Sequence, residues 1–194
     1  MEKNNTSTLK RFAQKGVFPY QFAFTLLIPL RNIFLSPRKL IQRLELKDND
    51  RVLEVGPGPG YFSAKVAQSI SSGILTLCDI QQEMLDLAKR RLERRKIFNI
   101  EYHLCNGISF PFENNRYDVI YMVTVLGEIE NQQQYIEEFY RLLRPGGCLS
   151  FSEQAGDPDK MSMAEIKDLL GGTGFQYDKF YGTENNFTIN FRKV

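Results

Sequence analysis

The sequence predicts an α/β fold in which a mostly parallel sheet of seven strands is doubly wound, with helices on both faces. Two observations support this prediction. Short apolar runs that suit buried strands alternate with helical segments, and three glycines follow the first of these runs at alternate positions. With 194 residues and 42% hydrophobic content, the chain can bury a full core. We therefore expect one domain over 1–194, made of a helical extension at 1–47 and a core at 48–194.

Strands and helices are expected to alternate through the middle of the chain. After three helical pieces, an apolar run begins at Val52 and ends in a glycine-rich turn, and a helix is expected from Tyr61 to Ile70. Four further apolar segments follow in the same manner. Three of them occupy residues 74–77, 102–105 and 117–121, and the last, which is the fifth strand of the chain, ends near Glu153.

Capping residues mark two of the helices, and a hairpin is expected after the second. Ser36 and Pro37 form an N-cap and N1 pair that opens a helix over 38–46. Ser162 and Glu165 make a capping box for 164–170, which Gly171 and Gly172 end. Strands at 175–181 and 186–192 are then joined by residues 182–185. The hairpin predicts one reversed strand at the edge of the sheet.

The turn over Val52 to Gly60 is the most informative feature of the chain. It reads Val-Leu-Glu-Val-Gly-Pro-Gly-Pro-Gly, a buried strand followed by glycines that permit a sharp turn without Cβ clashes. The N–H groups at the start of the next helix would face any ligand in this turn. The sequence therefore predicts a site for a small anionic or zwitterionic nucleotide-like ligand.

Two familiar nucleotide turns match this segment poorly. The dinucleotide fingerprint Gly-x-Gly-x-x-Gly/Ala requires a small residue at its last position. If the pattern starts at Gly56, that position is Tyr61; if it starts at Gly58, that position is Ser63. Pro57 and Pro59 also stiffen the loop. A phosphate loop ending in Gly-Lys-Ser/Thr is absent from the sequence.

Later segments agree with a different ligand. An acid, Asp79, follows the second strand nineteen residues after Gly60, where a carboxylate can accept from two ribose hydroxyls. Asn106 and Gly107 follow the third strand, and the string from Leu142 to Gly147 precedes the fifth. Together with the glycine turn, these ordered segments resemble the class I S-adenosylmethionine-dependent methyltransferases, in particular the branch that includes the ubiquinone and menaquinone enzymes. The resemblance covers roughly residues 38–194.

The resemblance implies a fold, a cofactor and a set of binding residues. It implies a Rossmann-like sheet with strand order three-two-one-four-five-seven-six, which binds S-adenosyl-L-methionine and releases S-adenosyl-L-homocysteine, without a metal. The family usually has Asp where this chain has Asn106, whose carbonyl oxygen can also accept from the adenine amino group. The implied cofactor-binding residues are Glu54, Gly56, Gly58, Gly60, Asp79, Ile80, Asn106 and Gly107.

Few side chains qualify as a general base. Methyl transfer is an in-line displacement in which positioning provides most of the rate, so a base is needed only for acceptors such as a hydroxyl or a carbon acid. Glu128 follows the fourth strand and Glu153 follows the fifth, and both are candidate catalytic residues, although either acid can also be a plain solvated or capping one. The single histidine, His103, is expected to be a packed core residue within the third strand.

The first 47 residues are basic and partly apolar. They contain nine Lys or Arg against two Glu, and residues 17–28 are apolar on nearly every side of a helix. We expect a lid over the cofactor cleft, with a peripheral membrane contact or a homodimer interface as alternatives. Tyr20 and Arg31 are candidate substrate contacts, since Arg31 can hold an acidic acceptor through paired hydrogen bonds.

Cysteines, hydropathy and charge give expectations for disulfide bonds, localisation and nucleic-acid binding. Cys78, Cys105 and Cys148 are odd in number and far apart, so we expect buried free thiols, with an arsenite-binding trio as the alternative. The longest apolar stretch is too short to span a membrane, and no signal peptide is recognisable, which predicts a cytoplasmic protein. A net charge of +2 and the lack of an RNA-binding motif argue against nucleic acid as a partner.

These observations predict an enzyme that transfers a methyl group from S-adenosylmethionine to a small, apolar or lipid-like acceptor. The alternative is a non-catalytic cofactor-binding or membrane-associated protein that keeps the fold but lacks an acceptor site.

Overall fold

The computed structural model describes residues 35–194. Tyr20, Arg31 and the apolar segment at 17–28 lie outside the described residues, so the proposed lid, membrane contact and dimer interface remain predictions for that part of the chain. Within residues 35–194, no helix is long and apolar enough to cross a membrane.

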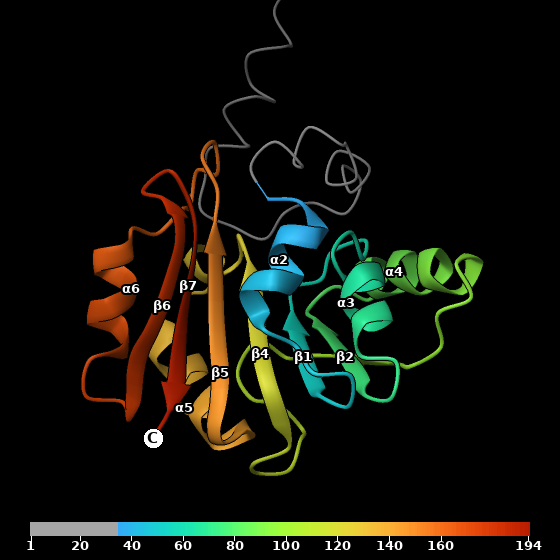
Figure 1. Ribbon diagram of the computed structural model, residues 1–194, viewed down its shortest axis with the longest axis horizontal. Coiled ribbons are helices and arrows are strands. Elements are labelled where there is room, and N and C mark those ends of the chain that lie inside the picture. The colour runs from blue at the N-terminus through green and yellow to red at the C-terminus, as the bar shows by residue number, and fades with distance from the viewer. Residues whose placement is uncertain (1–34) are drawn as a thin grey trace, which may run out of the picture.

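A seven-stranded sheet forms the centre of the molecule, with strand order β3-β2-β1-β4-β5-β7-β6 (Figure 1). Only β7 runs antiparallel to its neighbours, β5 and β6. The predicted fold class and strand order are therefore confirmed, although the reversed strand lies second from the edge rather than at it. The strands are β1 (Arg51–Val55), β2 (Ile74–Asp79), β3 (Ile100–Leu104), β4 (Tyr117–Val123), β5 (Leu143–Glu153), β6 (Phe175–Thr183) and β7 (Asn186–Lys193).

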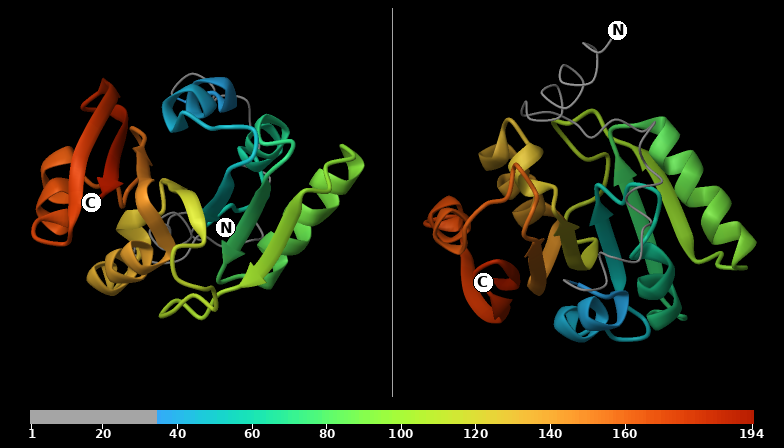
Figure 2. Two further views of the ribbon diagram at one scale, coloured as in Figure 1. Left: turned by 60° about the horizontal axis from the view of Figure 1, so that its bottom comes forward. Right: turned by 90° about the horizontal axis from the view of Figure 1, so that it is seen from above.

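Helices cover both faces of the sheet, as a doubly wound fold requires (Figure 2). One face packs against α2 (Pro37–Leu44), α3 (Ser63–Ser69) and α4 (Gln82–Arg94). The other packs against α5 (Gln132–Leu142) and α6 (Met163–Leu170). Each buried strand therefore contributes alternate residues to two separate apolar clusters.

Local signals set most of the helix ends. At the start of α2, the Ser36 hydroxyl accepts a hydrogen bond from the Lys39 N–H, and Pro37 is the first helical residue. At the start of α6, Ser162 and Glu165 form the predicted capping box. The helix after the glycine turn begins at Ser63, later than expected. The final hairpin turn is also tighter, because β6 continues through Thr183 and β7 begins at Asn186.

α2 is fastened to the sheet by hydrogen bonds that reach far along the chain. The Arg43 guanidinium donates to the Thr188 hydroxyl at 3.0 Å, and the Asn190 amide donates to the Arg43 carbonyl oxygen at 2.7 Å. Leu40 and Leu44 are fully buried beside them. The described part of the 1–47 extension is thus a structural layer on β5 and β7.

A disulfide joins Cys78, near the end of β2, to Cys105, the residue after β3. Their Cα atoms are 5.9 Å apart. The prediction of free thiols is therefore wrong for these two residues and confirmed for Cys148, which is buried and unbonded. Sequence separation concealed the pair, because parallel neighbouring strands bring residues 27 positions apart side by side. The cysteines consequently no longer argue for a reducing compartment.

We predict that the Cys78–Cys105 bond stabilises the fold by about 3 to 4 kcal/mol, because it closes a loop of moderate length in the unfolded chain. Addition of a phosphine reductant should lower the melting temperature of the native protein measured by calorimetry. The double variant Cys78→Ala/Cys105→Ala should no longer respond to the reductant, whereas Cys148→Ala should respond fully. A native protein whose melting temperature is unchanged by reductant would contradict this role.

Candidate functional site

The glycine turn after β1 has the geometry that its sequence predicts. Gly56, Gly58 and Gly60 all adopt positive φ, between 53° and 73°. A Cβ at Gly56 would lie 2.6 Å from a methyl carbon of Val125, and one at Gly60 would lie 3.2 Å from the Ala88 Cβ. The turn therefore requires glycine for its backbone conformation and for its close approach to neighbouring elements.

Asp79 ends β2 and joins the turn to the adjacent strand. Its carboxylate accepts from the Gln81 N–H at 3.0 Å and from the Gly58 N–H at 3.3 Å. Burial raises the pKa of Asp79, and these N–H groups together with that of Ile80 oppose the rise. A carboxylate has about four acceptor positions, so this side chain retains capacity for the two ribose hydroxyls that the sequence assigns to it.

Glu54 lies at the end of β1 beneath the turn. It is 3% exposed and accepts a hydrogen bond from the Ser63 hydroxyl at 2.5 Å. Burial raises its pKa to about 7, the Ser63 and Tyr121 hydroxyls lower it, and the nearby charge of Asp79 raises it further. A cationic group entering this region would favour the ionised carboxylate.

The loop after β3 is organised by Asn106. The side-chain oxygen accepts from the Ile108 and Ser109 N–H groups, each at 2.9 Å, so both of its lone pairs are used within the loop. The amide N–H₂, which also donates to the Ser109 hydroxyl at 3.5 Å, is then the group with remaining capacity, and the role of Asn106 toward adenine stays a prediction. Gly107 adopts a φ of +74°, and its missing Cβ would lie 3.9 Å from the Tyr135 hydroxyl and 3.8 Å from Ile80.

An apolar surface surrounds this loop. Ile80 is 44% exposed at the end of β2, and two further aliphatic side chains, Leu104 and Ile108, are exposed at the end of β3 and in the loop. Exposed aliphatic residues beside polar loop atoms suit the face and edge of a heteroaromatic ring.

The two candidate bases lie at the ends of neighbouring strands. Glu128 closes a short 3-10 helix, η3 (Leu126–Glu128), and its charge acts on Glu153 at the end of β5. Glu153 is 2% exposed, and burial raises its pKa to about 8. The close packing of Gly127 against the Asp159 backbone holds η3 beside the 157–160 loop, since a Cβ at Gly127 would overlap the Asp159 carbonyl oxygen.

Most of the predicted residues of the described chain therefore gather at the carboxyl ends of β1, β2, β3, β4 and β5. Sequence reasoning missed Val125, which lies against Gly56, and Tyr135, whose hydroxyl lies against Gly107. It also missed Gln154, which is buried next to Glu153 with an unpaired amide nitrogen. Nothing in the local sequence distinguished them from core residues. His103 lies in the third strand as expected, but the prediction of a core residue is wrong, because its side chain is 36% exposed and meets the Phe112 ring edge-on.

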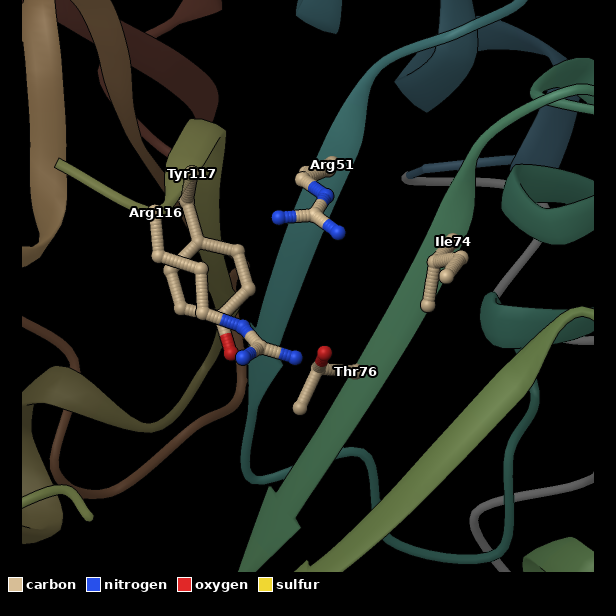
Figure 3. A pocket seen from close by; sticks show the side chains of 5 residues that line it. All are labelled: Arg51, Ile74, Thr76, Arg116 and Tyr117. Carbon is tan, nitrogen blue, oxygen red and sulfur yellow. The ribbon is translucent and has the colours of Figure 1, made fainter. Parts of the chain in front are cut away.

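A hollow at the opposite end of the sheet lacks the free polar groups found near the glycine turn. It is lined by the starts of β1, β2 and β4, where Arg116 and Thr76 face each other (Figure 3). Glu101 accepts from both, at 2.7 Å from Arg116 and 3.2 Å from Thr76, so the Arg116 charge is paired. Among residues 35–194, no three His, Cys, Asp or Glu side chains cluster as metal ligands.

Known proteins share the turn and the fold. A family model described as a methyltransferase domain matches residues 52–147. The ubiquinone/menaquinone biosynthesis C-methyltransferase UbiE of Stenotrophomonas maltophilia is 30% identical over 125 residues, covering 62% of this chain and 49% of that protein. The mitochondrial 2-methoxy-6-polyprenyl-1,4-benzoquinol methylase of Caenorhabditis elegans is 28% identical over 113 residues, covering 57% and 40%. The chain thus spans about half the length of these curated relatives or less.

A solved structure matches almost the whole chain. The crystal structure of a SAM-dependent methyltransferase from Aquifex aeolicus superposes with a TM-score of 0.85, covering 92% of this chain and all of that one. At 21% identity, this likeness shows the fold. Together, the matched methyltransferase domain, the related sequences and this fold support a class I S-adenosylmethionine-dependent methyltransferase. Within that family it resembles the ubiquinone and menaquinone methyltransferases.

We predict that Gly56→Ala disrupts ligand binding, because it combines backbone strain with a clash against Val125. Its affinity for S-adenosylhomocysteine, measured by titration calorimetry, should fall at least about tenfold, equivalent to about 1.4 kcal/mol. Gly146→Ala is the matched control: Gly146 has a φ of +75° but nothing within 4 Å of its missing Cβ. It should lose only stability, of about 1 to 2 kcal/mol. Equal affinities in the two variants would contradict the role of the close approach.

Proposed function

We propose that this protein transfers the methyl group of S-adenosylmethionine to a small acceptor molecule that binds beyond the ends of β4 and β5. The observation that carries the proposal is that buried carboxylates end three parallel strands at one edge of the sheet, with Glu54 and Asp79 beside the glycine turn and Glu153 at the end of β5. When bound, the cofactor supplies a methyl group already activated as a sulfonium.

The residues around the turn fit this cofactor. The turn at Gly56, Gly58 and Gly60 carries no side chains that could obstruct a ligand, and the spare acceptor positions of Asp79 suit ribose hydroxyls. Glu54 provides a negative charge for an ammonium group near the turn. The aliphatic side chains Ile80 and Ile108 offer contact to adenine, with the Asn106 amide as a donor to a ring nitrogen.

Glu153 is our proposed general base. A carboxyl group whose pKa is raised to about 8 binds a proton more tightly than an ordinary carboxylate, and it can therefore remove one from a weakly acidic hydroxyl or carbon acid. Burial is the main cause of the raised pKa, the charge of Asp157 raises it further, Lys160 opposes the rise, and the negative charge of Glu128 adds a smaller increase. In this proposal Glu128 is a positioning and tuning residue, and Glu153 touches the acceptor.

The acceptor class rests on sequence and likeness. The relatives named above act in quinone biosynthesis according to their names, and the N-terminal segment of this chain is apolar and basic. We propose a small apolar or lipid-like acceptor, contacted by Tyr20 and Arg31, with the N-terminal segment covering the site. Incubation with isotopically labelled methyl donor and fractionated cell extract, followed by mass analysis of labelled products, identifies the acceptor directly.

A non-catalytic cofactor-binding protein is the second candidate. It would bind S-adenosylhomocysteine but form no labelled product with any lipid or metabolite fraction. The burial of Glu153 at the end of β5 and its raised pKa favour the enzyme, because carboxyl groups perturbed in this way cluster at functional sites.

Asp79→Ala should weaken S-adenosylhomocysteine binding by roughly tenfold to a hundredfold, because it removes the acceptor for two ribose hydroxyls and a partner of the Gly58 N–H. Calorimetric titration measures the change. Asp86→Ala, an exposed acid on α4 that bonds only to Gln82, is the control and should bind normally. Unchanged affinity in a folded Asp79→Ala protein would remove the ribose assignment.

Turnover should rise with pH through about 8, because the base acts only when Glu153 has lost its proton. Glu153→Gln should abolish this rise and lower kcat by about a hundredfold or more while leaving cofactor affinity intact. Glu128→Gln should move the midpoint of the profile to lower pH, since it removes a negative charge that raises the pKa of Glu153. A pH profile that is identical in all three proteins would exclude Glu153 as the base.

A further inference from the structure

The Cys78–Cys105 disulfide lies next to residues of the candidate ligand site. Cys78 immediately precedes Asp79 at the end of β2, and Cys105 immediately precedes Asn106 in the loop after β3. Cys148, the third cysteine, packs into the apolar cluster on the other face of the sheet and is not bonded. The disulfide therefore joins two chain segments that each lead directly into the site.

Backbone hydrogen bonds also connect both cysteines to the site. The Gly56 N–H donates to the Cys78 carbonyl oxygen at 2.9 Å, which joins the glycine turn to β2. The Cys105 N–H donates to the Asp79 carbonyl oxygen at 2.8 Å, which continues the pairing of β2 with β3 by one residue. A displacement of either cysteine would thus move backbone that borders the ligand.

The loop after β3 is held from two sides. At its far end, α5 holds the chain: the Glu138 carboxylate accepts from the Phe110 N–H at 3.0 Å, and the Arg141 guanidinium donates to the Phe110 carbonyl oxygen at 3.0 Å. At its near end, the disulfide and the Cys105 N–H hold the chain against β2. Asn106 lies between these two anchors, so cleavage of the disulfide would weaken the near one.

The surroundings of the pair suit both its oxidised and its reduced form. Both cysteines belong to the apolar cluster shared with α5, where neutral thiols pack as small apolar groups. The Cys105 sulfur lies 3.9 Å from the His103 carbonyl oxygen, which can accept a weak hydrogen bond from a thiol. Cys78 is fully buried, whereas Cys105 is 8% exposed and lies between the exposed residues Leu104 and Asn106. Cys105 is therefore the partner that a reductant can reach.

We propose that Cys78 and Cys105 form a thiol–disulfide switch that controls how tightly the site holds S-adenosylmethionine. In the oxidised form, the bond fixes the ends of β2 and β3 in the arrangement described above, and the site is ordered before the cofactor binds. In the reduced form, the loop that carries Asn106 has to be ordered on binding, so the affinity falls. The inference rests on the proposed function, because it takes the ligand at the glycine turn to be this cofactor.

The electrons for the switch come from a dithiol. A thiolate of the dithiol attacks the Cys105 sulfur, the bond to Cys78 breaks, and Cys78 leaves as a thiolate that takes up a proton. The second thiol of the reductant then displaces Cys105 from the mixed disulfide. Two electrons and two protons thus pass to the protein, and the dithiol becomes a disulfide.

Titration calorimetry of S-adenosylhomocysteine with the full-length protein tests the switch. The protein is measured as isolated, after reduction with dithiothreitol, and after reoxidation with oxidised dithiothreitol, at a temperature where circular dichroism shows the oxidised protein to be folded. Affinity should fall by about fivefold to thirtyfold on reduction, the factor expected when about one backbone residue must be ordered on binding, and should return on reoxidation. Alkylation under denaturing conditions should count one free thiol before reduction and three after it.

Hydrogen exchange and two variants show whether the effect is local. On reduction, amide exchange should accelerate over residues 104–109 but not in β5 and β7. Cys78→Ala/Cys105→Ala should bind S-adenosylhomocysteine like the reduced native protein, with or without dithiothreitol. Cys148→Ala is the matched control and should keep the full response, since Cys148 lies on the opposite face of the sheet.

The outcomes separate the switch from the proposed function. If the oxidised protein does not bind S-adenosylhomocysteine, the proposed function fails and the switch with it. If it binds with the same affinity before and after reduction, the proposed function stands, the bond is purely structural and the switch is overturned. Unfolding on reduction, or three free thiols in protein isolated without reductant, would also overturn the switch.

Discussion

The approach of the β1 turn to the segment after β4 is the constraint on which the rest of the site depends. Gly56 lies so close to Val125 that no side chain fits between them, and Val125 in turn begins the 3-10 helix that carries Glu128. The glycine turn and η3 are thus joined by a close packing contact. A movement of the turn would be transmitted to η3 through the Val125 side chain.

Three buried carboxylates share this edge of the sheet, and burial raises the pKa of each. N–H and hydroxyl donors lower the pKa values of Glu54 and Asp79, whereas that of Glu153 is lowered by the Lys160 charge and one backbone hydrogen bond from Met161 and raised by the acids Asp157 and Glu128. Glu54 and Asp79 therefore suit hydrogen-bond donors and positive charge, whereas Glu153 holds a proton more tightly. The ends of β1 and β2 thus differ electrostatically from the end of β5.

Sequence patterns predicted the features that depend on local chemistry. The glycine turn, the Ser162 capping box and the acid at the end of β2 follow from residue types at fixed spacing, and the strand order followed from family resemblance. The Cys78–Cys105 bond and the approach of Tyr135 to Gly107 depend on which segments become neighbours in the folded chain. Asn106 illustrates the remaining gap, since only the folded loop shows that its oxygen is already used.

The position of β7 affects the order in which the two ends of the described chain can come together during synthesis. β7 is the last strand of this sheet to be synthesised, yet it inserts between β5 and β6. It also supplies Thr188 and Asn190, which hold α2 in place from 145 and 147 residues away. On the ribosome, α2 can pack early against α3, but the hydrogen bonds that hold it on the sheet form only after β7 emerges. The layer that α2 forms is therefore completed after the rest of the sheet has been synthesised.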